Sequence, residues 1–454
     1  MEQPQHSDSG RPLQGGIDDY RLELQRLQDE LEERQGVFRL VRTLARRLLK
    51  EPLFTFTGQY RRALHKEDHL LQANSFQPYS LNYRTPPGSG KRPVVVHVLG
   101  NFCVGGLVRL VVDLIEWTSD TYEHVVLTLH NPQPPAFLDV KVVELGEKTS
   151  LPQFTRQIAA FNPAIIHVHH YAPHSLYHAW AWYRRALLAA ASLKVPIVEG
   201  INVPMIPYFH PAVRAYVFVS RYVQDSFGFN GCPNRVIYPG SDFSLFAPRP
   251  RQFSDTIGMV YRLDESKLRK ESINVFIRVL QARVSTKAII VGDGCLLSYF
   301  KEQVQKAGLT ERFTFTGYVS YETLPEIYSR MDVFVAPVFC ESFGQVAPFA
   351  MNMGLPVAAY AAGALPEILN DSSVVAPTGD ASALAEIILG LLTDPMRAEE
   401  IARQNQKRAR CFFSLERMVE EYGWLYGAVL EKRTSSSDLR WALKTPFPMR
   451  SRAS

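Results

Sequence analysis

The chain has 454 residues, of which 46% are hydrophobic and 21% are charged, and its formal net charge is +5 at pH 7. The hydrophobic share excludes a mostly disordered chain. The length predicts two or three domains, because ordinary domains contain about 100–200 residues. The net charge is small for this length, so we expect no nucleic-acid partner, which would require a concentrated basic face.

Five cysteines are spread widely over the chain, and no two of them form a Cys-x-x-Cys pair: Cys103, Cys232, Cys295, Cys340 and Cys411. The odd count and wide spacing predict neither a disulfide framework nor a zinc site. We expect buried free thiols in a reducing cytoplasm. The polar N-terminus and the absence of a run of 18 apolar residues predict a cytoplasmic protein without a spanning helix.

Two segments precede the main body. Residues 1–16 are polar and are expected to form a disordered tail, and residues 17–92 are expected to form a helical, basic extension and a linker. Within residues 17–66, a helix with an arginine-rich face follows an amphipathic helix. Such a helix can lie on an anionic membrane surface, or it can pack on the main body or on a second subunit. The pattern leaves both alternatives open.

From Val94 onward, short β-branched runs alternate with helical patterns, and this rhythm restarts after the proline- and arginine-rich stretch at residues 248–254. The alternation predicts an α/β fold with two tandem Rossmann-like, doubly wound domains, at residues 93–250 and 251–432. A ligand is expected in a cleft that faces both carboxyl edges. Residues 433–454 are expected to form a basic tail. The expected strands are 94–100, 124–130, 164–170, 196–201, 215–220 and 235–240, then 256–263, 287–294, 312–317, 332–338, 355–360 and 373–377.

The segment Glu341-Ser342-Phe343-Gly344 comes directly after an expected strand and directly before an expected helix. A strand–glycine–helix junction presents free backbone N–H groups, which suit phosphates or hydroxyls. The carboxylate of Glu341 could accept hydrogen bonds from sugar hydroxyls. We therefore predict a donor-sugar pocket between Pro337 and Glu367.

Together with the turns at residues 354–356 and 363–367, this ordered set resembles the GT-B-fold glycosyltransferases, in particular the retaining family 4. The resemblance implies transfer of a hexose from a UDP- or GDP-linked donor, with retention and without a metal or other cofactor. We expect a glycan or lipid-linked acceptor. The basic helix expected within residues 17–66 suggests a cell-envelope glycan and action at the cytoplasmic face of a membrane.

The resemblance also assigns residues to the donor. Arg262 and Lys267, after the first strand of the second domain, would neutralise the departing diphosphate. Gly292 lies in a turn after the next strand, and Gly317 and Tyr318 would lie beside the nucleotide base. In the first domain, the loop at Gly105 and Gly106 would approach the sugar, since glycines permit close backbone contact.

A histidine-rich stretch, residues 167–174, ends another expected strand. The resemblance implies that His169 faces the donor sugar, and we treat His167 as structural. A cluster of histidines is also typical of a metal-binding site. The resemblance argues against it, since the family positions the diphosphate with arginine and lysine.

Phe349 departs from the family pattern, which has a glutamate that holds the nucleotide ribose at this position. A phenylalanine accepts no hydrogen bond, although it could stack or fill space. Three outcomes follow: an active enzyme with a looser ribose contact, altered nucleotide choice, or lost catalysis. Lost catalysis would leave a sugar-nucleotide-binding partner of another transferase. A nucleotide-sugar 2-epimerase on the same fold is a second alternative to a transferase.

Overall fold

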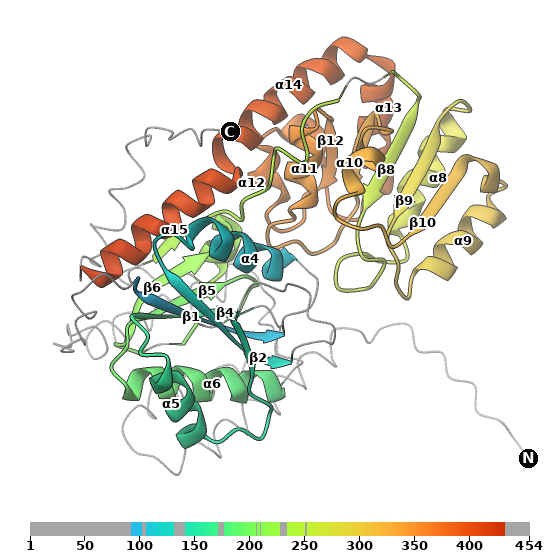
Figure 1. Cartoon of the computed structure of the whole chain (residues 1–454). Helices are drawn as coiled ribbons and strands as arrows, with labels where there is room; N and C mark the ends of the chain where they lie inside the picture. Colours follow the sequence, from blue (N-terminus) through green and yellow to red (C-terminus); the bar gives the residue numbers. More distant parts are fainter. Residues whose placement is uncertain are drawn as a thin grey trace, which may run out of the picture.

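The computed structural model describes residues 92–101, 106–130, 141–170, 177–205, 207–208, 210–227, 234–249 and 252–431. These residues form two α/β domains, each built around one sheet of parallel strands (Figure 1). The N-terminal extension, with its predicted membrane or subunit contact, and the basic tail lie outside the described residues. So do Gly105, Cys103 and Cys232.

The first domain contains a seven-stranded sheet in the order β3-β2-β1-β4-β5-β6-β7. Its strands are rich in valine and isoleucine, as expected for strands covered on both faces. The order reverses direction between β1 and β4, which lie side by side in the middle of the sheet. The strands are β1 (Val94–Asn101), β2 (Glu123–His130), β3 (Lys141–Glu144), β4 (Ile165–His170), β5 (Ile197–Ile201), β6 (Val213–Phe218) and β7 (Asn234–Val236).

Helices cover both faces of this sheet. Successive strand residues point to opposite faces, and the apolar residues on each face pack against a different set of helices. Val96 and Val98 of β1 pack with α5 (Leu151–Ala160) and α6 (Tyr177–Ser192). Val95 and Leu99 belong to a separate apolar cluster with α4 (Gly106–Thr118). The short helix α7 (Arg221–Phe227) follows β6. The predicted doubly wound architecture is confirmed.

The second domain has a six-stranded sheet in the order β10-β9-β8-β11-β12-β13. Its strands are β8 (Thr256–Val260), β9 (Lys287–Val291), β10 (Phe313–Gly317), β11 (Val333–Ala336), β12 (Val357–Tyr360) and β13 (Val375–Ala376). Its helices are α8 (Ser272–Ala282), α9 (Leu297–Lys306), α10 (Leu324–Tyr328), α11 (Val346–Asn352), α12 (Leu365–Leu369), α13 (Ala381–Thr393) and α14 (Pro395–Phe412), with 3-10 turns η1 (Thr310–Arg312) and η2 (Ser372–Val374).

The last helix differs from the sequence-based expectation. We expected the second domain to extend to residue 432, but α15 (Leu415–Leu430) packs on the first sheet beside α4 (Figure 1). Its apolar face, which includes Met418, Tyr422 and Tyr426, belongs to the same cluster as Val95. The chain thus crosses back from α14, and α15 ties the two domains together.

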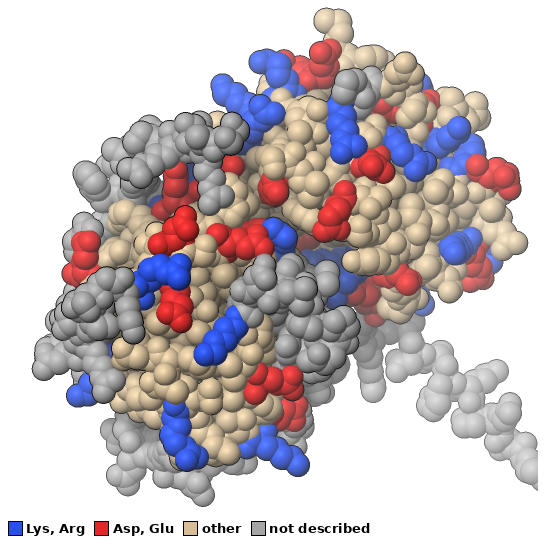
Figure 2. All heavy atoms as spheres, viewed as in Figure 1, with Lys and Arg blue, Asp and Glu red and all other residues tan. Residues whose placement is uncertain are grey.

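The surface carries charges of both signs and three exposed thiols. Acidic and basic residues are interspersed over the face drawn in Figure 2. Cys295, Cys340 and Cys411 are free but exposed, which corrects the expectation of buried thiols for these three. Within the described ranges, every helix is too short or too polar to cross a bilayer.

Candidate active site

The predicted donor-binding residues of the second domain gather at the carboxyl edge of its sheet. Arg262 follows β8, Gly292 follows β9 and Glu341 follows β11. The strand order reverses between β8 and β11, so the loops after these two strands diverge there. In open α/β sheets, ligands bind outside the carboxyl ends of the strands at such a switch point. The sequence motifs therefore converge where the fold favours a ligand.

Glu341 and Lys267 form an ion pair at this edge. Glu341 is only 3% exposed, and the Nζ of Lys267 lies 2.5 Å from its Oε1. The Lys267 side chain is 29% exposed, so part of it remains in contact with solvent. A buried carboxylate is costly unless it is paired and hydrogen-bonded. Lys267 supplies this charge, and the pair offers one anionic and one cationic group to a ligand.

Two glycines enclose Glu341. Gly344 has φ +83°, and a Cβ at this position would lie 2.9 Å from the Cδ of Glu341. Gly363 has φ +57°, and its Cβ would lie 1.8 Å from the backbone oxygen of Glu341. An added methyl group would collide with the side chain at one position and with the backbone at the other. The glycines of the motif thus allow the chain to close tightly around this carboxylate.

Arg262 and its neighbour Tyr261 differ sharply in exposure. The Arg262 side chain is 75% exposed, and its Nε lies 3.7 Å from Asp264, a loose contact. Tyr261 is buried, and its hydroxyl makes no hydrogen bond to any other residue that the structure describes. Burial and the nearby Glu341 raise the pKa of Tyr261, so the phenol is neutral. The guanidinium is free to meet an anion, whereas the phenol lies behind the site.

The remaining predicted glycines come from several loops. The backbone N–H of Gly292 donates to the carbonyl of Gly317 at 2.9 Å, which joins the turns after β9 and β10. Tyr318, the next residue, is 71% exposed. Gly106 of the first domain faces Gln345, because a Cβ on Gly106 would lie 3.2 Å from the Gln345 Oε1. Gly106, the first residue of α4, therefore meets the segment that follows Gly344.

Phe349 fills space in an aromatic cluster. Its ring stacks on Phe246 with centroids 4.0 Å apart and planes 5° apart, and the edge of Tyr321 packs against it. Phe349 is 4% exposed. The side chain that replaces the ribose-holding glutamate of the family is thus a core residue in this protein. Of the two possibilities for Phe349, stacking on a ligand and filling space, the structure favours the second.

Replacing Phe349 tests this assignment. Phe349→Ala is expected to lower the free energy of unfolding by about 3–5 kcal/mol, because it removes a buried ring and leaves a cavity. Phe349→Leu should cost about 1–2 kcal/mol, since it loses the stacking but keeps most of the volume. Chemical denaturation measures both values. A variant that keeps wild-type stability but binds nucleotide more weakly would contradict a purely structural role.

His169 occupies a different place from the one we expected. It is 1% exposed and lies on the face of β4 that α4 and α15 cover. His167 lies on the same face, since residues two apart in a strand point the same way. The two rings are 3.8 Å apart, and the Nδ1 of His167 contacts the Tyr426 hydroxyl at 2.7 Å. His169 is a core residue here, which corrects the prediction of direct contact with a sugar.

A chain of hydrogen bonds fixes the tautomers of these histidines. The Thr118 hydroxyl donates to the Leu114 carbonyl at 2.6 Å, so its oxygen accepts from the Nε2–H of His124 at 2.9 Å. Neutral His124 then accepts at Nδ1 from the Nε2–H of His97, and neutral His97 accepts at Nδ1 from the Nε2–H of His169, both at 3.0 Å. Sequence reasoning missed His97, although it stands beside His167 in the β1–β4 register.

The same cluster is the one place in the described part of the chain where three metal-ligating side chains gather. Nitrogen atoms of His97, His167 and His169 lie within 4.8 Å of one another. Neutral imidazole is the form that binds metals. All three residues are buried histidines, so a divalent cation would bring uncompensated charge into the core. The hydrogen-bond relay accounts for both ring nitrogens of His97 without an ion.

These buried histidines predict a pH-dependent stability. Burial lowers the pKa of His124 to about 4, and it lowers the pKa of His97, His167 and His169 well below the ordinary value. The unfolded chain binds protons on these imidazoles below about pH 6.5, whereas the folded chain does not. The stability that they contribute is complete above that pH and is lost as the pH falls. We expect the free energy of unfolding to decrease by up to about 1.4 kcal/mol per pH unit for each imidazole.

Chemical denaturation between about pH 7 and pH 5 measures this slope. His124→Gln should reduce the slope by roughly one proton, because one titrating group is removed. A slope that is the same in wild type and in this variant would contradict the assignment.

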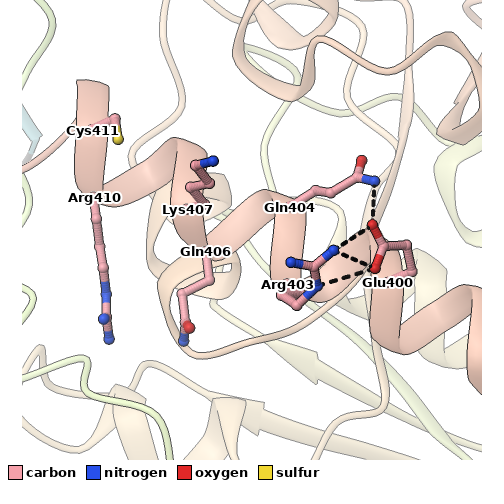
Figure 3. A pocket seen from close by; sticks show the side chains of 7 residues that line it. All are labelled: Glu400, Arg403, Gln404, Gln406, Lys407, Arg410 and Cys411. Carbon is pink, nitrogen blue, oxygen red and sulfur yellow. Dashed lines mark hydrogen bonds and ion pairs between the residues drawn. The ribbon is translucent and has the colours of Figure 1, made fainter.

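A separate surface hollow lies on α14 (Figure 3). Its lining comes from one helix segment: Glu400, Arg403, Gln404, Gln406, Lys407, Arg410 and Cys411. Arg403 pairs with Glu400 at 2.7 Å, an exposed ion pair of the kind that contributes little free energy. The hollow contains none of the motif residues that gather at the carboxyl edge of the sheet. We therefore place the candidate site at that edge.

Comparison with known proteins gives a family match that covers most of the second domain. Residues 245–408 match the family described as glycosyl transferases group 1. A 2-deoxystreptamine glucosyltransferase of Streptomyces kanamyceticus is 31% identical over 148 residues, which is 32% of this chain and 38% of the relative. The lipopolysaccharide core biosynthesis mannosyltransferase LpsB of Rhizobium meliloti is 26% identical over 221 residues, 44% of this chain and 62% of the relative. The matches thus span less than two thirds of either relative.

Solved structures resemble both domains together. The crystal structure of Anabaena HepE in complex with UDP and glucose is 18% identical, with a TM-score of 0.60 over 74% of this chain and 99% of that one. Sucrose-phosphate synthase from Thermosynechococcus elongatus is 20% identical, with a TM-score of 0.61 over 75% of this chain and 100% of that one. At sequence identities of 18% and 20%, these similarities establish a shared fold and not a shared activity. The chain therefore has the GT-B fold, and residues 245–408 of its second half match the glycosyl transferases group 1 family.

Proposed function

We propose that this protein transfers a hexose from a nucleotide-diphosphate sugar to a glycan or lipid-linked acceptor with retention of configuration. One observation carries the proposal: the Glu341–Lys267 pair and the exposed Arg262 lie at the switch point of the second sheet, beside a glycine-rich loop. Cations and backbone N–H groups suit a diphosphate, and a carboxylate suits sugar hydroxyls. All these groups belong to the second domain, so we place the donor mainly there.

In the proposed reaction, the bond between C1 of the sugar and the diphosphate oxygen breaks. The acceptor hydroxyl attacks C1 on the same face, and the departing phosphate takes the hydroxyl proton. Arg262 and Lys267 stabilise the charge on the leaving group, and electrostatic stabilisation of this kind is commonly the largest catalytic term. Glu341 orients the sugar. The reaction needs neither a covalent nucleophile nor a metal ion.

The named relatives support the choice of substrate class. They include a glucosyltransferase, a lipopolysaccharide core mannosyltransferase and a structure with bound UDP and glucose. We therefore propose a UDP- or GDP-linked hexose as donor. The lipopolysaccharide relative favours a cell-envelope glycan as acceptor.

Phe349 favours a second candidate function, a sugar-nucleotide-binding partner of another transferase. A phenylalanine, buried against Phe246, stands where the family has the carboxylate that holds the ribose. Such a protein would bind the donor without turnover. The retained Glu341, Arg262 and Lys267 make the active transferase our first choice, because these residues act on the bonds that break.

A panel of nucleotide sugars, scored first by thermal shift and then by transfer to an acceptor panel, separates these candidates. We expect one donor to raise the melting temperature and then to be consumed in an acceptor-dependent reaction. Binding without consumption would support the partner function, and an epimer formed from donor alone would identify an isomerase. A panel in which no nucleotide sugar binds would overturn the proposal.

A further inference from the structure

Glu367, in α12 of the second domain, accepts three hydrogen bonds from the first domain. Its Oε1 accepts from the backbone N–H of Arg221 at 2.8 Å, and its Oε2 accepts from the N–H of Tyr222 at 3.0 Å. The hydroxyl of Tyr238 donates to Oε1 at 2.6 Å. Hydrogen bonds to an ionised acceptor are roughly twice as strong as those between neutral groups. One side chain therefore joins the domains at three points.

The loop of the candidate active site is attached to the first domain at a neighbouring point. The hydroxyl of Ser220, a buried residue that directly precedes α7, donates to the backbone carbonyl of Ser342 at 2.6 Å. The ring of Tyr238 lies 5.9 Å from the ring of Phe343. The first domain thus contacts both α12 and the two residues that follow Glu341.

A short rigid path connects Glu367 to Glu341. The backbone N–H of Ala364, which precedes α12, donates to the carbonyl of Glu341 at 2.9 Å, and Gly363 packs directly on that carbonyl. At the other end of α12, the Arg408 guanidinium donates to the carbonyls of Glu367 and Ile368 at 2.8 and 2.7 Å. Any displacement of α12 therefore moves the backbone of Glu341.

We propose that Glu367 is a positioning residue that couples closure of the two domains to the placement of Glu341. While its three bonds are intact, the first domain holds α12 and the Glu341 loop in one arrangement. When they break, the domains can separate and water can reach the sugar, since domain closure excludes it. The inference rests on the proposed transferase function, although Glu367 itself touches no reacting atom.

Kinetics of Glu367→Gln test this role. The variant keeps the volume but replaces one carboxylate oxygen by an amide N–H2 group, so one of the two backbone N–H groups faces a donor in place of its acceptor. We expect kcat to fall by about 10- to 100-fold, because small misplacements of reacting groups have effects of this size. The Kd for UDP should stay within about 2-fold, since the diphosphate contacts lie elsewhere in the second domain. The ratio of donor hydrolysis to transfer should rise.

Two further variants sharpen the test. Glu386→Gln, an exposed position on α13, is the matched control and should behave as wild type. Tyr238→Phe removes one of the three bonds and keeps the ring contacts, so a smaller loss of kcat is expected. The double variant Glu367→Gln with Tyr238→Phe should lose less than the sum of the two, because both changes break one network.

Small-angle X-ray scattering gives a readout that does not depend on turnover. With UDP present, Glu367→Gln should have a larger radius of gyration than wild type and the control. Wild-type kcat, hydrolysis ratio and radius of gyration in Glu367→Gln would overturn the positioning role and leave the proposed function intact. A loss of kcat that disappears after correction for the folded fraction would also overturn it. If wild-type protein transfers no sugar, the proposed function fails, and scattering still decides the coupling of the domains.

Discussion

Replacing Arg262 and Lys267 together with alanine is expected to lower kcat/KM for glycosyl transfer by about 10³-fold or more. The two cations meet the leaving diphosphate, and loss of a preorganised charge in such a site is rarely replaced by water. Steady-state kinetics with the donor identified in the nucleotide-sugar panel measure the effect. Transfer at the wild-type rate would contradict the assignment.

The single variants separate catalysis from stability. Lys267→Ala leaves the buried Glu341 carboxylate without its partner, so it is expected to lower the melting temperature as well. Arg262→Ala removes a 75% exposed side chain with only a loose contact to Asp264, so its stability should be unchanged. Arg262→Ala should still reduce kcat/KM by about 10²-fold. The pair Arg278→Ala and Lys287→Ala, at exposed positions of the same domain, is the matched control.

Glu341→Gln is expected to weaken donor-sugar binding and turnover while it leaves binding of the free nucleotide nearly unchanged. The amide preserves the volume between Gly344 and Gly363, so the loop should keep its shape. It loses the charged acceptor for sugar hydroxyls, and we expect kcat/KM to fall by about 10²-fold. Calorimetry with UDP should give a Kd within about 3-fold of wild type.

Comparing the affinity for UDP with the affinity for the complete donor separates contacts to the nucleotide from contacts to the sugar. An equal loss of affinity for UDP and for the complete donor would contradict a sugar-facing role, because Glu341 would then act on the nucleotide. Glu386→Gln provides the control for a change of charge on the same domain.

Much of the fold could be predicted, because strand and helix periodicity are local properties of the sequence. The apolar runs at β1 and β8 mark the start of each domain, and the order of motifs after β8, β9 and β11 placed the candidate site at one sheet edge. Glu341 and Gly344 were found at a strand–glycine–helix junction and Lys267 through the resemblance to the family. The structure places both Lys267 and Gly344 against Glu341.

The errors concern properties that only tertiary packing decides. The helical pattern of α15 does not say which sheet its apolar face covers, and Tyr422 and Tyr426 pack on the first domain. His169 stands at the carboxyl end of β4, where ligands bind, yet α4 and α15 cover its face of the sheet. A strand pattern gives the face of a residue relative to its neighbours but not what covers that face.

Glu367 and Phe349 illustrate the same limit at the site. Glu367 belongs to a motif visible in the sequence, but its three partners come from the other domain, more than a hundred residues away in the chain. Phe349 is visible as a departure from the family pattern. Only the stacking on Phe246 distinguishes a side chain that fills the core from one that meets the nucleotide.

A crystal structure of the protein with its nucleotide-sugar donor tests the central claim most directly. We predict that the diphosphate lies within hydrogen-bonding distance of Arg262 and Lys267, that backbone N–H groups near Gly344 contact it, and that Glu341 accepts from sugar hydroxyls. A donor bound elsewhere, for example in the α14 hollow around Arg403 and Lys407, would contradict the account.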